Sequence, residues 1–148
     1  MSAMNDLLAF QRQTEALSSI SERLGWDQET VMPRGAAEQR AEEMAAIEAV
    51  LHERRTDERI GEWLEAAQPQ TAVDTRTVEL IARDFNRARK IPARLASELA
   101  RLTSLSQGIW AEARAKDAPE DFLPTLDQVL MLKREEAAAV ADGGDLYD

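Results

Sequence analysis

The sequence predicts an all-α protein, an antiparallel bundle of five or six helices in a single domain over residues 1–148. Apolar residues recur at spacings of three and four along most of the chain, which is the period of one helix face. No run shows convincing strand alternation, and the connections between helical segments are short, which favours neighbours that pack side by side. With 148 residues, one domain can bury a core without a metal or a disulfide.

Two apolar stripes predict the first two helices. The first helix spans about residues 5–23, and we expect Gly25 to end it. Its stripe consists of Leu7, Phe10, Leu17, Ile20 and Leu24. The second spans about residues 34–53, with a stripe of Ala37, Ala41, Met44, Ile47 and Leu51.

Capping residues and prolines predict the middle helices. Asp57 is a candidate cap for a short helix carrying Ile60, Trp63 and Leu64, which fails before Pro69. The next helix spans about residues 71–90. Pro92 then supplies a first-turn residue for a longer helix. The apolar side of that longer helix consists of Leu95, Leu99, Leu102, Ile109 and Ala113.

The segment KDAPEDF separates this helix from the last one. We expect Asp117 to cap the last helix and Pro119 to lie near its first turn. The adjacent glycines of ADGGD end it, because glycine costs the helix backbone entropy. Its apolar side consists of Phe122, Leu126, Val129, Leu130 and Ala137.

Composition and charge argue against several functions. The net charge of −10, from 28 acids and 18 bases, disfavours nucleic acid, which attracts positive charge. Interleaved charges such as those of EQRAEE indicate solvated helix faces. The chain has no cysteine, no run long enough to span a membrane and no export signal. We therefore expect a cytoplasmic protein that binds neither membranes nor nucleic acid.

One segment, LGWDQETVMPRG at residues 24–35, does not have the pattern of an ordinary helix. A solvated loop has no need for Trp26, whose large ring requires cover. One interpretation is structural: Trp26 packs under the loop, and Asp27 or Thr30 caps the helix near Pro33.

Several segments in the same order resemble the carboxypeptidase Taq family of zinc metallocarboxypeptidases. LGWDQETVMPRGAAEQRAEEMAAIEAVLHE resembles the N-terminal region of that family. An Arg-Asp-aromatic helix, a Lys-Ile-Pro turn, WAEAR and LKREE follow as in the family, so the likeness covers most of residues 8–140. The resemblance implies the N-terminal domain of a longer helical enzyme, truncated here, that removes C-terminal amino acids from peptides in a deep groove.

The zinc site that the resemblance implies is an H-E-x-x-H helix plus a downstream glutamate. His52 is the only histidine and opens an H-E-x-x pattern, but Thr56 stands where the second histidine belongs. We expect His52 to pair with Glu48 one turn earlier. Asp74 begins an imperfect match to the family's D-x-R-x-T element, and it fits the first turn of a helix better. We therefore assign no catalytic or metal-binding residue, and we expect zinc or another divalent metal only in the full-length enzyme.

The segment Trp26, Asp27, Gln28, Glu29 and Thr30 is the candidate site. It either buttresses the groove wall or approaches the substrate channel, and we favour the buttress. The expected partners are the missing C-terminal catalytic region, peptide substrate in the full-length enzyme, and a homodimer.

Two other functions compete with a carboxypeptidase domain. A freestanding dimerisation or protein-binding module would use exposed apolar surface. The residues expected to form that surface are Met44, Leu99, Leu102, Ile109, Trp110 and Met131. A bundle that binds two metals through carboxylates needs more than one histidine. We interpret its candidate ligands, Glu42, Glu43, Glu135 and Glu136, as surface charge.

Overall fold

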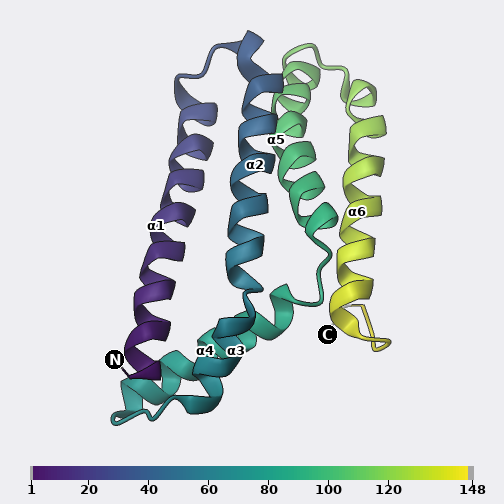
Figure 1. Ribbon diagram of the computed structural model, residues 1–148. Coiled ribbons are helices and arrows are strands. Elements are labelled where there is room, and N and C mark those ends of the chain that lie inside the picture. The colour runs from purple at the N-terminus through teal and green to yellow at the C-terminus, as the bar shows by residue number, and fades with distance from the viewer. Residues whose placement is uncertain (1, 147–148) are drawn as a thin grey trace.

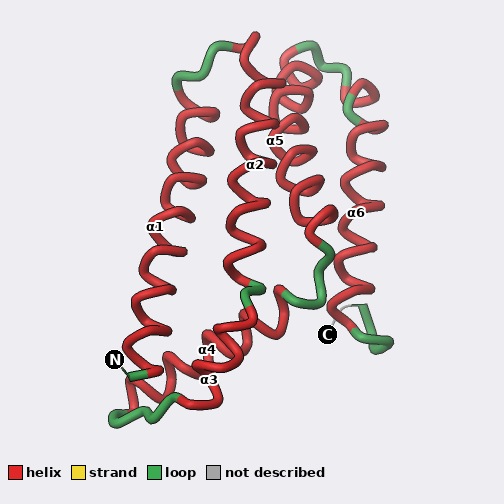
Figure 2. Tube along the Cα trace, in the orientation of Figure 1, coloured by secondary structure: helices red, strands yellow, loops and turns green. Residues whose placement is uncertain are grey.

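The computed structural model describes residues 2–146 and is helical, with no strand among them (Figure 2). The α-helices are α1 (Ala3–Thr30), α2 (Ala37–Arg55), α3 (Glu58–Ala66), α4 (Ala72–Ala88), α5 (Ala93–Ala115) and α6 (Leu123–Ala141). Short 3-10 turns precede α2 (Arg34–Ala36) and α6 (Pro119–Asp121). The predicted all-α class and antiparallel packing are confirmed. Within the described range, no helix has the length and apolar character required to cross a membrane.

The four long helices stand side by side in the order α1, α2, α5, α6, with alternating directions (Figure 1). The most extensive helix contact joins α2 to α5, and α1 and α6 pack on the outer sides of this pair. The short helices α3 and α4 lie across the lower end in Figure 1. The arrangement is an open row of long helices, so both of its broad faces are available to other structure.

The core has two main parts, and Ala41 and Ala113 are also buried, near the upper ends of α2 and α5. Between the long helices, the buried side chains include Leu51 of α2 and Leu95, Leu99 and Leu102 of α5. At the lower end a second cluster joins α1 to α3 and α4 through Leu7, Phe10, Ile60 and Phe85. The predicted exposure of Leu99 and Leu102 is therefore wrong, because the contact between α2 and α5 covers them.

Several predicted helix ends are confirmed. The Asp57 carboxylate accepts a hydrogen bond from the Arg59 backbone at the start of α3. Thr71 and Asp74 form a capping box at the start of α4, in which each side chain accepts from the other residue's backbone N–H. This places Asp74 in the first turn, as expected. The helix α6 ends at Ala141, just before the paired glycines.

Two expected boundaries are wrong. Helix α1 does not end at Gly25 and continues to Thr30. One glycine inside a helix costs only about 1 kcal/mol, and the contacts of the following turn with α2 and α5 offset that cost. Asp117 does not cap α6. It adopts φ 53° and ends α5. Its N–H donates to the Arg114 carbonyl, and the Ala118 N–H donates to the Ala113 carbonyl, which is the Schellman motif.

Candidate functional site

The candidate segment, residues 26–30, forms the last turn and a half of α1 at the upper end of the row. Trp26 is 66% exposed, so the interpretation that it packs under the loop is wrong. Neither Asp27 nor Thr30 caps a following helix. The Thr30 hydroxyl instead donates to the Trp26 carbonyl one turn earlier, and the 3-10 turn after Pro33 has no side-chain cap.

Arg40 fixes this segment against α2. Its guanidinium donates to the Asp27 carboxylate at 2.6 Å, to Glu43 at 2.9 Å, and to the Leu24 carbonyl. Arg40 is only 9% exposed, so these three acceptors satisfy a charge that has largely left water. The hydrogen bond that Arg40 donates to Asp27 is the largest cause that raises the pKa of Arg40 above its ordinary value.

Gln28 fixes the same segment against α5. Its amide nitrogen donates to the Ser104 carbonyl at 2.7 Å, and the Ser104 hydroxyl donates back to the Gln28 amide oxygen at 2.8 Å. Ser104 is buried. One turn further along α5, Gln107 donates to Glu29 at 3.4 Å. Asp27 and Gln28 thus join α1 to two neighbouring helices, whereas the Trp26 ring is free on the outside.

A groove of about 550 Å³ lies beside this segment, and we call it the upper groove. It is bounded by the end of α1, the turn before α2, and the second half of α5. Its lining includes Gln28, Glu29, Met32, Leu105, Gly108 and Ile109. The lining combines apolar side chains such as Met32 and Ile109 with charged side chains such as Glu38 and Lys116.

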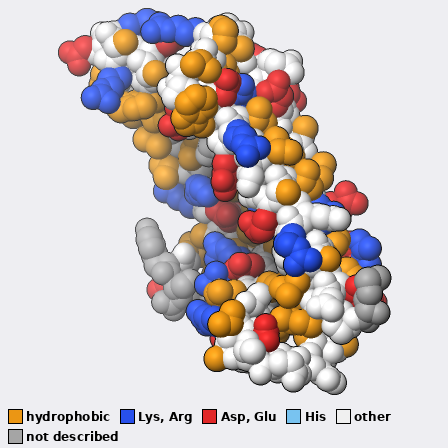
Figure 3. Space-filling view, turned by 90° about the vertical axis from the view of Figure 1, so that its left-hand side faces the viewer, with side chains coloured by type: hydrophobic (Ala, Val, Ile, Leu, Met, Phe, Trp, Pro, Cys, Tyr) orange, Lys and Arg blue, Asp and Glu red, His pale blue; other side chains and the backbone are white. Residues whose placement is uncertain are grey.

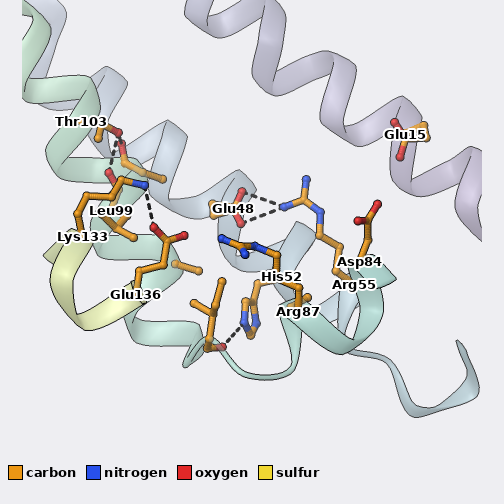
Figure 4. Close-up of a pocket in the computed structure, with 14 residues that line it drawn as sticks. Glu15, Glu48, His52, Arg55, Asp84, Arg87, Leu99, Thr103, Lys133 and Glu136 are labelled. Atoms are coloured by element: carbon orange, nitrogen blue, oxygen red, sulfur yellow. Dashed lines mark hydrogen bonds and ion pairs between the residues drawn. The ribbon is translucent and has the colours of Figure 1, made fainter. Parts of the chain in front are cut away.

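A second depression, of about 540 Å³, lies among α2, α4, α5 and α6 and is strongly charged (Figure 4). Arg55 donates to Glu48 at 3.1 Å, and Lys133 donates to Glu136 at 2.9 Å. These opposite charges are therefore paired within α2 and within α6, on the lining of the pocket.

His52 lines the charged pocket but does not pair with Glu48, so that expectation is wrong. Its Nε2 lies 2.7 Å from the Ile91 carbonyl. A carbonyl only accepts, so Nε2 carries the proton in this bond and is not available to a metal. The Thr56 hydroxyl, at the place of the second histidine in H-E-x-x-H, donates to the His52 carbonyl at 2.8 Å.

The donor set does not fit a catalytic zinc ion. Such sites use three protein ligands, commonly histidines with a carboxylate. Among residues 2–146, no three histidine or acidic side chains lie close enough together to hold a metal. The one imidazole is bonded to a carbonyl, and the acids are distributed over separate helix faces.

Sequence reasoning missed Arg40 and Ser104. Arg40 belongs to the EQRAEE run, which was interpreted as a solvated face, and its burial shows that interpretation to be wrong for this residue. A usable signal was its position three residues after Ala37 and four before Met44, on the face of the α2 stripe. Nothing in the sequence indicates that Ser104 meets Gln28, 76 residues away.

A family model described as carboxypeptidase Taq (M32) metallopeptidase matches residues 6–148. Thermostable carboxypeptidase 1 of Thermus thermophilus is 40% identical over a match that covers 99% of this chain and 32% of the relative. Thermostable carboxypeptidase 1 of Pyrococcus furiosus is 26% identical, over 98% of this chain and 30% of the relative. The chain thus spans about a third of the length of these relatives.

Solved structures give the same fold. The crystal structure titled BsuCP superposes with a TM-score of 0.91 at 21% identity, covering 99% of this chain and 30% of the other. The apo-Mg structure of Pyrococcus furiosus carboxypeptidase gives a TM-score of 0.74 at 25% identity, covering 100% and 30%. The row of helices is therefore a recurring part of a larger helical protein.

Proposed function

We propose that this chain, which belongs to the carboxypeptidase Taq (M32) metallopeptidase family, forms the N-terminal helical part of a longer metal-dependent carboxypeptidase. The complete enzyme would remove C-terminal amino acids from peptides with zinc or another divalent metal. The metal ligands would lie in the part of the family protein that this chain does not span. The present helices would act as a scaffold and as one wall of the peptide groove.

One observation supports this division of roles most directly. The family match runs over residues 6–148, yet within the described range the potential ligands do not converge on a metal site. Arg40 and Gln28 hold the end of α1 by hydrogen bonds that need no substrate. This supports a buttress role for Asp27 and Gln28. The exposed Trp26 ring is the member of the segment that is free to contact another part of the enzyme.

A peptidase assay tests the proposal. The purified chain is incubated with a peptide that has a free C-terminus and with the same peptide blocked there, with Zn²⁺ or Co²⁺ supplied. We expect no release of amino acids above background from either peptide. Metal-dependent release from the free peptide alone would contradict the division of roles, because it would require a metal site within this chain.

The proposal also includes a cytoplasmic location and a homodimer. The absence of cysteine is compatible with a reducing compartment. Exposed apolar side chains outside the upper groove, such as Met131, are compatible with association. Sedimentation from micromolar to millimolar concentrations tests the dimer, and a strict monomer throughout that range counts against it.

A further inference from the structure

We propose that the upper groove is a docking surface for an apolar helix with basic residues along its edges. The helix would belong to the part of the family protein that this chain does not span. The inference rests on the proposed function, since it names the place where the scaffold meets the remaining region.

The chain exposes more surface than a compact monomer of its mass would. The chain exposes 9775 Å², whereas a compact monomer of its mass exposes about 7,500 Å². The excess of about 2,000 Å² is what one side of a large permanent interface buries. The open row of four helices is the structural reason for the excess (Figure 1).

The second half of α5 is more exposed than its first half. Residues 107–112 are all exposed, over more than one and a half turns of the helix, and Ala113 after them is buried. They include Ile109, 38% exposed, and Trp110, 45% exposed even though its ring packs on Phe122 at 5.3 Å. In the first half of the same helix, Leu95, Leu99 and Leu102 are buried. Figure 3, seen from the α1 side, shows hydrophobic side chains in separate groups over both the upper and the lower part of the molecule.

Gly108 lines the upper groove. It lies inside α5, and glycine is less favourable than alanine in the interior of a helix. A Cβ built at Gly108 meets no atom within 4 Å, so no neighbour within the described chain requires the small residue. The open space over Gly108 leaves room for a second backbone to approach α5 closely.

The charges around the groove indicate the occupant. The lining contains the acids Glu29, Glu38, Glu112 and Asp121 and the bases Arg34 and Lys116. This excess of acid favours an amphipathic helix with basic edges, which would lie with its apolar face in the groove. A second copy of this chain is a poorer occupant, because each copy carries a net charge of −10.

Hydrogen exchange with a separate probe tests the inference. The probe is the part of the Thermus thermophilus relative that the match does not cover, expressed as its own polypeptide and shown to be helical by circular dichroism. Amide exchange of the full chain is measured with and without the probe, and binding is measured by calorimetry. The variants are Gly108→Leu, Gly108→Ala, and Ala138→Leu as a control at an exposed position of α6.

We expect the probe to slow exchange over residues 105–112. Gly108→Leu should weaken binding at least about tenfold, since overfilling a packed contact is costly, while Ala138→Leu binds as the unchanged chain does. Gly108→Ala should stabilise the isolated chain but weaken binding, whereas a glycine that contacts no partner would show the gain in stability alone. These results would support the groove as the docking surface.

Three results would overturn the inference. Binding with protection elsewhere, unaffected by Gly108→Leu, would refute the groove and leave the proposed function intact. Protection of residues 105–112 that grows with the concentration of the chain alone would assign the groove to a second copy. Absence of binding by the helical probe would refute the proposed scaffold role, and the inference with it.

Discussion

The guanidinium of Arg40 lies 2.6 Å from the carboxylate of Asp27, and this contact joins the last turn of α1 to the first turn of α2. Arg40 is buried, whereas the Asp27 side chain is 38% exposed. The pair therefore combines a desolvated base with a partly solvated acid. The Leu24 carbonyl and Glu43 accept from two further donors of Arg40, so the contact belongs to a network.

Removing the Arg40 side chain should be strongly destabilising. Arg40→Ala leaves Asp27, Glu43 and the Leu24 carbonyl without their donor, and we expect a loss of about 2–3 kcal/mol in the free energy of unfolding. Urea denaturation measures this loss. Arg76→Ala is the matched control, because the Arg76 side chain is 66% exposed and forms an ion pair with Glu79 on the surface of α4. We expect a change below about 0.5 kcal/mol there. Equal losses of unfolding free energy in the two variants would show that the Arg40 hydrogen bonds stabilise the chain no more than one exposed ion pair does.

Gln28 and Ser104 should be energetically coupled. Their reciprocal hydrogen bonds predict a coupling energy of about 0.5–1.5 kcal/mol in a double-mutant cycle of Gln28→Ala and Ser104→Ala. Denaturant unfolding of the four proteins measures it. A control cycle of Gln28→Ala, at the upper end of α1, with Arg59→Ala, in α3 at the lower end of the row, should be additive. A coupling no larger than in this control would mean that the two side chains act independently.

Asp57 should contribute stability that is lost in acid. The hydrogen bond from Arg59 is the main cause that lowers the pKa of Asp57 below its ordinary value. Because the pKa is lower in the folded chain, the contribution is fully present above the unfolded value of about 3.9 and disappears as the pH falls through the folded value.

Asp57→Asn checks this dependence, because asparagine keeps the helix cap but carries no charge to pair with Arg59. Thermal unfolding from pH 7 to pH 2 should show the gap between the two proteins closing below about pH 4. A gap that stays constant over the whole range would contradict the assignment. Asp57→Ala should lose about a further 1 kcal/mol at every pH, since it also removes the cap.

Asp117→Gly should stabilise the chain. Asp117 has φ 53° at the end of α5, a conformation that costs an L-residue roughly 1–2 kcal/mol. Aspartate tolerates it better than most, so we expect a gain of about 0.5 kcal/mol, measured by urea denaturation. The adjacent Lys116 has φ −90°, and Lys116→Gly should instead lose stability. A loss in both variants would mean that the left-handed position is not strained.

The sequence by itself determined the helices and most of their ends. Period-three and period-four spacing reveals helices because it reports burial of one face, and Asp57, Thr71 and Asp74 cap through bonds that span only two or three residues. The family resemblance was also available, since several motifs in a fixed order are specific. One histidine and no cysteine already limited the metal chemistry.

The tertiary structure decided which residues act together. Helix α1 passes through Gly25 because Asp27 and Gln28 have partners on α2 and α5, and such partners are invisible to local patterns. His52 bonds to the Ile91 carbonyl and not to Glu48, since the loop between α4 and α5 brings that carbonyl close. Arg40 is buried because its face of α2 is covered by the end of α1. Contacts between distant segments depend on how helices pack, and no spacing within one helix records that packing.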